Sequence, residues 1–348
     1  MSGAALSGAG DRVLVTRLAY LGDVVLSLPL VDALRASFPG IEIDYLTRRP
    51  GAELLTGDPR FALVHVQRNG LGAALRLVRA LRARRYRAVI DLYANPRSAW
   101  LSWSTGAPVR VGGDRRGRRR LYTHPVSVAP SVRRVTDIFM QYGAPLGVAG
   151  PASKPSLALN AAECSRAGDV LVRAGVTRRP VVGVHPGGKW SVKRWPAAGF
   201  ADLIRLLRGT LGADVLVFTG PGEEDATAAL RAAVGDEARY APPLGVRELA
   251  AVMSRLDAMV ACDGGVMHVA AAVATPTVGI FGSSEPAVWF PYTGAGPYEA
   301  AYIDVACRPC HRHVCPLGHT RCLNELTAAM VADRVAHVLA MSRAGAAS

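Results

Sequence analysis

The 348-residue sequence has no long apolar run and no leader-like beginning. Its first residues, Met1 to Asp11, are small and polar, without a basic stretch followed by an apolar core, so we expect no signal peptide. The longest uncharged run, Gly264 to Ser284, contains His268, Pro276 and several glycines and is too weakly apolar for a membrane span. We therefore expect a cytoplasmic protein whose cysteines are mostly reduced.

Lysine is also scarce, because only three of the 41 basic residues are Lys. Against 27 acidic residues the net charge is +14, and the excess is uneven. Residues 1–150 carry 22 basic and 10 acidic residues, whereas residues 151–348 carry 19 and 17. Genome base bias explains Arg over Lys but not this asymmetry. The N-terminal half is therefore expected to meet something anionic, such as an acidic glycolipid, a membrane surface or nucleic acid.

Short apolar strands alternate with amphipathic helices along the chain, which predicts an α/β fold with parallel sheets. The expected strands are 12–16, 41–47, 63–66, 88–92, 180–185, 214–219, 258–262 and 277–281. The expected helices are 24–37, 71–84, 161–174, 198–211, 223–234, 247–254 and 327–340. Proline-rich sequence near 145–155 separates two doubly wound halves, and ligands of such sheets bind at the carboxyl ends of the strands.

The segment Asp263-Gly264-Gly265-Val266-Met267-His268 lies between an expected strand and an Ala-rich helix. Glycines let the backbone approach a ligand closely, and the free N–H groups of a helix start suit an anion. Asp263 can accept hydrogen bonds from hydroxyl groups, so the segment suits a nucleotide sugar. The alternative is a plain strand–helix turn in which Asp263 is only an N-cap.

Two other junctions carry candidate binding groups. His185-Pro186-Gly187-Gly188-Lys189, continued by Lys193-Arg194-Trp195-Pro196, is a glycine-rich basic loop able to hold a diphosphate. Walker-type spacing is absent, which excludes a nucleotide-hydrolysing P-loop. In Thr219-Gly220-Pro221-Gly222-Glu223-Glu224, either glutamate can bond ribose hydroxyls or cap a helix.

Asp23 follows the first expected strand in the pair Gly22-Asp23. A carboxylate at a helix N-terminus stays ionised, helped by the helix dipole. If it faces a cleft it can act as a general base toward a hydroxyl, and otherwise it is an N-cap.

In this order, Gly22-Asp23, Lys193-Arg194-Trp195-Pro196, the Gly-Pro-Gly-Glu turn and Asp263-Gly264-Gly265 with His268 resemble glycosyltransferase family 9, the heptosyltransferases. The resemblance runs from Arg12 to about the last helix, and the segment 307–327 most resembles the branch that adds the second heptose. It implies a GT-B fold of two facing Rossmann-like domains. It also implies inverting transfer of heptose from ADP-heptose to the lipopolysaccharide inner core, with no catalytic metal.

By the same resemblance, Asp23 is the catalytic base and Lys193 contacts the donor phosphates. Glu223 or Glu224 contacts the ribose, Asp263 the heptose, and the helix start at Gly264-Gly265 the diphosphate. The other predicted donor-binding residues are Gly187, Gly188, Lys189 and His268. The Gly187-Gly188-Lys189 loop departs from members of the family that carry hydroxyl residues there.

The resemblance divides the chain into three parts. Residues 1–158 are the predicted acceptor-binding domain, and residues 159–326 the nucleotide-sugar-binding domain. Residues 327–348 are a predicted C-terminal helix and tail that packs back on the N-terminal domain.

Four of the six cysteines, Cys307, Cys310, Cys315 and Cys322, lie within sixteen residues, with three histidines among them. In a cytosolic protein such a cluster suggests a structural zinc or iron–sulfur centre. The spacing matches no standard finger, so reduced structural thiols, or disulfides formed in air, are the alternatives. Catalysis in the resembled family needs no metal, and any metal here would be structural.

Two arginine runs fall in the predicted acceptor domain: Arg115, Arg116, Arg118, Arg119 and Arg120, and Arg82, Arg84, Arg85 and Arg87. A phosphorylated, Kdo-bearing lipid or an anionic bilayer would be drawn to them, so the first run is the predicted acceptor contact. No nucleic-acid recognition module accompanies the charge. The alternative is a solvated basic loop.

These observations predict an enzyme that moves heptose from ADP-heptose to an anionic, lipid-linked inner-core acceptor, through a Kdo or heptose hydroxyl. Two alternatives stay open. The same clamp would serve another nucleotide sugar or an acceptor outside lipopolysaccharide. Less in keeping with the residues is a non-catalytic binder of a glycolipid or nucleotide. Contact with the cytoplasmic face of the inner membrane is part of the prediction.

Overall fold

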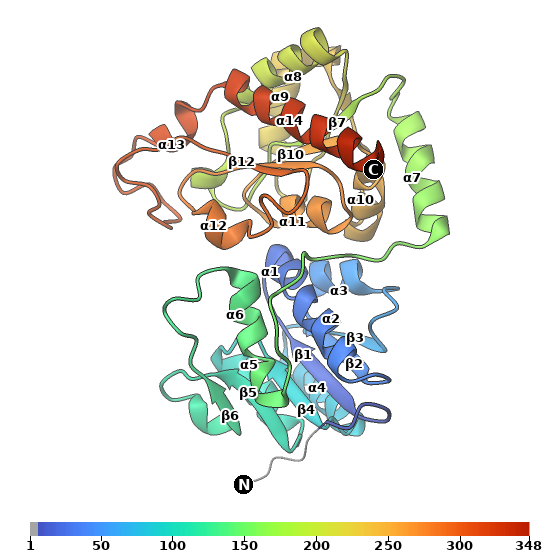
Figure 1. The fold of residues 1–348 in the computed structure, drawn as a ribbon, viewed down its shortest axis with the longest axis vertical. Coiled ribbons are helices and arrows are strands. Elements are labelled where there is room, and N and C mark those ends of the chain that lie inside the picture. Colours follow the sequence, from blue (N-terminus) through green and yellow to red (C-terminus); the bar gives the residue numbers. More distant parts are fainter. Residues whose placement is uncertain (1–5, 348) are drawn as a thin grey trace. The chain divides into compact units, whose positions relative to one another are not determined.

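Each half of the chain is built on a six-stranded, wholly parallel sheet, as the computed structural model shows for residues 6–347 (Figure 1). The chain divides after Ala158 into two units. The first sheet has the order β3-β2-β1-β4-β5-β6 and the second the order β12-β11-β10-β7-β8-β9. Because both orders reverse at an inner strand, both units are doubly wound, with helices between successive strands. The predicted α/β class with parallel sheets is confirmed.

The strands are short, and those at the centre of each sheet are buried on both faces. The first unit contains β1 (Arg12–Thr16), β2 (Glu42–Thr47), β3 (Leu63–Val66), β4 (Ala88–Asp91), β5 (Val109–Gly113) and β6 (His124–Val126). The second contains β7 (Val181–His185), β8 (Asp214–Val217), β9 (Arg239–Tyr240), β10 (Ala258–Cys262), β11 (Thr277–Ile280) and β12 (Tyr298–Ala301). Apolar runs such as Ala258–Cys262 suit a strand covered by helices on both sides.

Helices fill the crossovers between the strands. The first unit has α1 (Leu21–Leu26), α2 (Leu28–Ser37), α3 (Arg49–Leu55), α4 (Leu71–Ala83), α5 (Pro96–Ser104) and α6 (Val135–Gln141). The second has α7 (Ala161–Arg173), α8 (Ala197–Leu211), α9 (Glu224–Val234), α10 (Val246–Met253), α11 (Gly265–Ala272), α12 (Pro286–Trp289), α13 (Arg321–Asn324) and α14 (Ala328–Ala347).

The single helix predicted over 24–37 is two helices, and it begins earlier than expected. α1 starts at Leu21, so Asp23 is the third residue of a helix and not part of a preceding turn. Ser27 ends α1 and caps α2. Pro29 follows in the first turn of α2 and has no N–H to continue the bonding pattern of α1, which explains the break.

The last helix belongs to the second unit. The resemblance predicts that residues 327–348 pack back on the N-terminal domain, but α14 packs on α8 and on strands β10, β11 and β12 of the second unit. Its apolar side chains Val331, Val335, Val338 and Leu339 join the core under the second sheet. Their i, i+4 spacing gives one apolar face, and the sheet is the surface that buries it.

Within the described residues, no helix is both long enough and apolar enough to cross a membrane. The prediction about a signal peptide concerned Met1 to Asp11, of which residues 1–5 lie outside the described part of the chain.

Candidate active site

The predicted donor residues of the second unit meet at the carboxyl edge of its sheet. His185 is the last residue of β7, and Asp263 directly follows β10, with which β7 pairs. The turn at Gly220 follows β8, the other neighbour of β7. Because the strands are parallel, their ends lie side by side, and residues far apart in the sequence form one surface.

Asp263 is held by a lysine and a serine. The Lys193 ammonium lies 2.5 Å from Asp263 Oδ2, and the Ser284 hydroxyl donates to the same oxygen. Lys193 ends a short turn in the β7–α8 loop, and Ser284 lies in the loop after β11. Asp263 is buried, and an ionised group there requires a partner. The sequence pointed to Asp263 and Lys193 separately, but it gave no signal for Ser284.

Glu223 is the second carboxylate of this edge, and it is partly buried. Its Oε2 lies 2.7 Å from Nε2 of His185 and accepts a hydrogen bond from the backbone N–H of Gly220. Burial raises the pKa of the Glu223 carboxyl, but the His185 ring and the backbone N–H groups of Gly220 and Gly188 outweigh it, so the pKa is lowered. Glu223 is therefore an anion in the folded protein.

The structure separates the two glutamates that the sequence left open. Glu224 is the first residue of α9, is exposed, and accepts only a 3.2 Å hydrogen bond from the N–H of Gly222. Glu223 points back into the carboxyl edge of the sheet and bonds to His185. Of the two, only Glu223 shares a surface with Asp263 and the glycine-rich loop.

The glycine-rich loop makes room for Glu223. A Cβ at Gly187 would lie 2.1 Å from Glu223 Oε2, and one at Gly220 would lie 2.5 Å from it. Gly188 has φ +153°, which side-chain-bearing residues rarely adopt. Lys189 is exposed, with its ammonium 5.3 Å from the centre of the Trp190 ring. The loop thus combines tight backbone packing with an accessible cation.

The helix start predicted for the diphosphate is present. α11 begins at Gly265 with Gly264 as its N-cap, and both glycines are partly exposed. His268, one turn later, is buried, and its Nδ1 lies 2.6 Å from the Tyr292 hydroxyl. The first N–H groups of α11 have no partner within the helix and carry the positive end of its dipole, which suits a phosphate oxygen.

In the first unit, Asp23 is paired through one oxygen. Arg17 NH2 lies 2.8 Å from Asp23 Oδ2, and the Tyr20 N–H donates to the same oxygen at 2.9 Å. The other oxygen, Oδ1, accepts no hydrogen bond from any described residue, although the carboxylate is largely buried. Asp23 is therefore ion-paired with Arg17 through one oxygen, and its other oxygen is left to take a hydrogen bond or a proton.

Besides Ser284, Arg17 is a group of the site that no sequence pattern indicates. It directly follows β1, its NH1 donates to the Leu92 carbonyl at 2.7 Å, and its guanidinium lies over the rings of Tyr93 and Phe139. These contacts fix the cation from three sides, so the position of Asp23 is set by the carboxyl ends of β1 and β4 together. One arginine after a strand gives no sign of this in the sequence.

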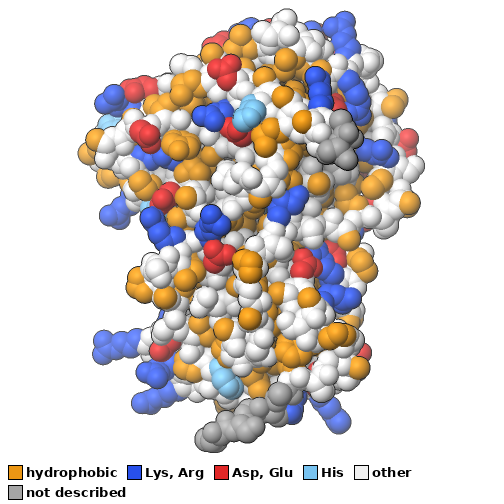
Figure 2. All heavy atoms as spheres, viewed as in Figure 1, with side chains coloured by type: hydrophobic (Ala, Val, Ile, Leu, Met, Phe, Trp, Pro, Cys, Tyr) orange, Lys and Arg blue, Asp and Glu red, His pale blue; other side chains and the backbone are white. Residues whose placement is uncertain are grey.

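The arginine run 115–120 follows β5, at the carboxyl edge of the first sheet where β1 and β4 also end. Arg115, Arg116, Arg119 and Arg120 are exposed, and Arg119 lies 3.5 Å from Asp114. Lys and Arg side chains project from this part of the first unit in Figure 2. In the other run, Arg84 bonds to Asp44 and Glu42 and is thus engaged in the fold.

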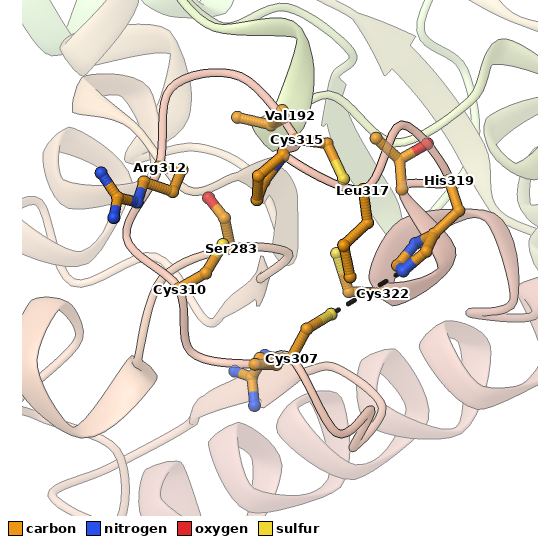
Figure 3. A pocket seen from close by; sticks show the side chains of 12 residues that line it. Val192, Ser283, Cys307, Cys310, Arg312, Cys315, Leu317, His319 and Cys322 are labelled. Atoms are coloured by element: carbon orange, nitrogen blue, oxygen red, sulfur yellow. Dashed lines mark hydrogen bonds between the residues drawn. The ribbon is translucent and has the colours of Figure 1, made fainter.

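The four clustered cysteines surround one small cavity, together with Val192, Leu317 and His319 (Figure 3). Cys307 Sγ lies 4.0 Å from Nε2 of His319. Among residues 6–347, however, no three His, Cys, Asp or Glu side chains are arranged to hold a metal ion. The predicted zinc or iron–sulfur centre is therefore unsupported, and all four cysteines are free thiols. Apolar and arginine side chains occupy part of the same lining.

The thiols of this cluster differ in acidity. Backbone N–H groups of Thr320, Leu317, Gly318 and His319 point at the sulfur of Cys315 and lower its pKa. Burial and the neighbouring thiols raise the pKa of Cys322. The surroundings of Cys315 thus favour its thiolate, and those of Cys322 disfavour it.

The cysteine-rich segment is connected to the donor edge. The Arg308 guanidinium donates to the carbonyls of Gly282 and Ser284, and the His311 N–H donates to the Ser283 carbonyl. The His313 ring stacks on Trp190, with ring centres 4.1 Å apart. Residues 307–322 therefore brace both the loop of Ser284 and the glycine-rich loop.

Comparison with known proteins gives a consistent family. The model of glycosyltransferase family 9 (heptosyltransferase) matches residues 74–320. Lipopolysaccharide heptosyltransferase 1 of Pseudomonas aeruginosa is 30% identical over 326 residues, covering 87% of each chain.

Two solved structures from Escherichia coli are similar in fold. ADP-heptose lipopolysaccharide heptosyltransferase II has a TM-score of 0.80 at 22% identity, over 95% of this chain and 99% of the other. Heptosyltransferase WaaC with ADP-2-deoxy-2-fluoro heptose has a TM-score of 0.71 at 20% identity, over 93% and 99%. These likenesses confirm the α/β fold with two Rossmann-like domains.

Proposed function

The chain belongs to glycosyltransferase family 9, the heptosyltransferases, and we propose that it moves heptose from ADP-heptose to a Kdo or heptose hydroxyl of the lipopolysaccharide inner core. The observation that carries this proposal is the carboxyl edge of the second sheet. There a paired Lys193 and Asp263 lie in the loops that flank the open start of α11. Relatives named for ADP-heptose and lipopolysaccharide support this choice of sugar and acceptor.

The donor binds to residues 159–326 of the second unit. The first N–H groups of α11, at Gly264 and Gly265, receive the diphosphate, and Lys193 supplies the cation that faces it. Gly187, Gly188 and Lys189 line the phosphates from the neighbouring loop. Because Lys193 is already bonded to Asp263, the arriving phosphate shares this ammonium with the carboxylate.

Recognition of the sugars falls to the carboxylates of the same edge. Asp263 accepts hydrogen bonds from heptose hydroxyls, and Glu223, the inward-facing glutamate, from the ribose. His268 supports the start of α11 from its buried position against Tyr292. Glu224 is exposed and is the weaker candidate for the ribose.

Asp23 in the first unit, residues 1–158, is the general base. The acceptor hydroxyl donates to the open Oδ1 and loses its proton to it as the oxygen bonds to the anomeric carbon of the heptose. The bond from that carbon to the diphosphate oxygen breaks at the same time, and the electron pair leaves with ADP. Attack opposite the leaving group inverts the anomeric centre.

Charge develops on the diphosphate as the bond breaks, and Lys193 with the start of α11 stabilises it there. These groups do for the leaving group what a divalent metal does elsewhere, so the proposed transfer needs no metal. Arg115, Arg116, Arg118, Arg119 and Arg120 attract the anionic, lipid-linked acceptor from the cytoplasmic side of the membrane.

A panel of nucleotide sugars tests the donor. The melting temperature of the full chain is measured with ADP-heptose and with ADP-, UDP- and GDP-linked hexoses. A ligand at 100 times its Kd adds about 2.7 kcal/mol to the stability of the form that binds it. ADP-heptose should give the largest rise. A larger rise with a UDP- or GDP-sugar would replace the donor in this proposal.

A transfer assay tests the reaction itself. The chain is mixed with ADP-heptose and, separately, with a Kdo-terminated and a heptose-terminated core acceptor, and the product is followed by mass spectrometry. Transfer to one of them is expected. Donor binding without transfer to any core acceptor would favour an acceptor outside lipopolysaccharide, or a protein that binds without catalysis.

A further inference from the structure

One stretch of the first unit is rich in arginine and contains almost no acidic residues. Between Phe61 and Gly113 the sequence has nine arginines and a single acidic residue, Asp91. Asp91 is fully buried, where its carboxylate accepts hydrogen bonds from the Tyr122 hydroxyl and from the Tyr93 N–H. No carboxylate of this stretch therefore reaches the surface to neutralise the arginines.

Two helices of this stretch expose large apolar side chains. α4 and α5 follow β3 and β4, contact each other, and are drawn fainter behind the first sheet in Figure 1. On α4, Leu71 is 79% and Leu75 is 59% exposed; on α5, Trp100 is 43% and Trp103 is 53% exposed. The i, i+4 and i, i+3 spacings place each pair on one face of its helix. Other exposed large apolar side chains occur in the described chain, among them Val172, Val314 and Leu317, but these four lie together on two helices that contact each other.

A groove lies between the two helices. It has a volume of about 360 Å³, and Leu71, Leu77, Trp100 and Leu101 line it. An apolar groove that remains open to solvent loses the burial that such side chains normally contribute to folding. It therefore marks a surface that something else covers.

Arginines surround these apolar groups. Arg68, Arg76, Arg79 and Arg97 are exposed, and none of them is in an ion pair with any described residue. Arg97 makes a 3.3 Å hydrogen bond to Asn69, and Arg68 and Arg97 also line the groove. We call these four arginines with Leu71, Leu75, Trp100 and Trp103 the α4–α5 surface.

We propose that the α4–α5 surface docks the protein on an anionic lipid bilayer. Tryptophan sits well at the boundary between acyl chains and headgroups, and leucine inserts below it. Arginine binds phosphate with its planar guanidinium, and each basic residue near an anionic membrane adds to the attraction. A second copy of the chain fits poorly, because it would place arginines against arginines. The proposal rests on the proposed function in one respect: a lipid-linked acceptor is met at a membrane.

Vesicle flotation tests the proposal without any sugar donor. The full chain is mixed with vesicles of phosphatidylcholine alone, or with one third phosphatidylglycerol, and the bound fraction is measured against lipid concentration. Binding to the anionic vesicles only, weakened by salt, is expected. Equal binding to both vesicles, or binding to neither, would overturn the proposal.

Matched variants locate the contact. The triple variant Arg68→Ser, Arg76→Ser, Arg79→Ser should bind anionic vesicles roughly 100-fold more weakly, since each arginine is worth about fivefold. The control Arg166→Ser, Arg173→Ser, Arg178→Ser removes three exposed arginines of the second unit and should bind as the unmodified chain does. An equal loss in both would mean unspecific attraction by net charge and would overturn the proposal.

The apolar part has its own pair of variants. Leu71→Ser with Leu75→Ser should weaken binding about tenfold or more, because the leucines no longer insert. Val172→Ser with Met330→Ser removes two other exposed apolar side chains and should change nothing. Light scattering on the same samples checks the oligomeric state. A dimer of the unmodified chain that Leu71→Ser and Leu75→Ser dissociate would assign the surface to a second copy.

The docking experiment and the transfer assay can fail independently of each other. Transfer to a deacylated, water-soluble acceptor should be the same for the unmodified chain and for the α4–α5 variants. Transfer to a lipid-linked acceptor in anionic vesicles should fall with the bound fraction. If no transfer occurs with any acceptor, the proposed function fails, while the flotation result still decides on docking.

Discussion

The carboxyl edges of the two sheets hold their carboxylates in different ways. In the second unit, Asp263 pairs with Lys193, and Glu223 pairs with His185. In the first unit, Arg17 takes one oxygen of Asp23 and leaves the other open. The charged groups of a binding edge can pair with one another in the free protein and then pair with a ligand when it binds. A group that must accept a proton needs an open oxygen.

The two halves of the chain also differ in net charge. The second half is close to neutral, and the carboxylates Glu223 and Asp263 at its sheet edge are both paired. The first half carries the excess, and much of it lies on exposed arginines in the loop 115–120 and on the α4–α5 surface.

Of the substitutions considered for the two units, Asp23→Asn should reduce transfer the most. The amide keeps the shape of the side chain but cannot take the proton, so transfer should fall by roughly two to four orders of magnitude. The affinity for ADP, measured by calorimetry, should stay within about twofold because the proposed donor site lies in the second unit. Asp137→Asn, in α6 of the same unit, is the control and should transfer normally. Normal transfer by the Asp23→Asn variant would remove Asp23 from the mechanism.

Lys193→Ala should affect binding and turnover together. It removes a charge-assisted phosphate contact and leaves the buried Asp263 without its cation, so the Kd for ADP should rise about tenfold to 100-fold. Lys189→Ala, which removes an exposed lysine of the same loop, should have a smaller effect. Titration calorimetry with ADP measures both. Equal Kd values for the Lys193→Ala variant and the unmodified chain would mean that Lys193 does not reach the phosphates.

Asp44→Asn compares the units in stability. Asp44 is buried in β2 and bonds to Arg84, His65 and the Tyr86 hydroxyl. Burial raises the pKa of Asp44, but these bonds outweigh it and lower the pKa from 3.8 to about 2. The lowered pKa corresponds to about 2 kcal/mol of stability, present above the unfolded pKa and lost as the pH falls from about 4 to about 2.

Urea unfolding at several pH values measures this contribution. The Asp44→Asn variant should be less stable than the unmodified chain by about 2 kcal/mol at pH 7, and the difference should shrink toward pH 3. Glu223→Gln should show the same sign in the second unit, since the pKa of Glu223 is also lowered. A difference that stays constant from pH 7 to pH 3 would contradict an ionised Asp44.

Replacing the arginines of the loop 115–120 by serine should have the smallest effect on chemistry. The KM for the lipid acceptor should rise about tenfold, and the KM for ADP-heptose should not change, because the proposed donor site lies in the second unit. The increase should shrink with salt, since exposed charges are screened beyond about 10 Å at 0.1 M ionic strength. Losses toward both substrates would indicate a folding defect, and no loss would make the run a solvated loop.

Much of the fold follows from local sequence. The strands 12–16, 63–66 and 258–262 were predicted with the bounds that the structure has, because a buried strand is a short apolar run. Asp263 and His185 were placed at strand ends, and strand ends of a parallel sheet coincide in space. The broken helix at Ser27 could also have been foreseen from Pro29.

The pairings at the edges could not be foreseen in this way. Ser284 reaches Asp263, and His185 reaches Glu223, across gaps in the sequence that no local pattern spans. Arg17 is near Asp23 in the chain, but its orientation depends on Leu92, Tyr93 and Phe139 from other elements. The cysteine spacing placed four thiols together but did not decide whether they converge on one ion.

The bracing of the donor edge by residues 307–322 has a consequence for chemical reactivity. Arg308 and His311 hold the loop of Ser284, so a donor that orders that loop also orders the cysteine-rich segment. Cys315, whose surroundings favour the thiolate, would then report on a site to which it contributes no ligand. ADP should slow the alkylation of Cys315 by iodoacetamide, read by peptide mass spectrometry, while Cys164 on α7 reacts at an unchanged rate. The alkylation rate of Cys315 would in this way report whether the donor site is occupied, and the cysteines of the cluster are suitable places to attach a label.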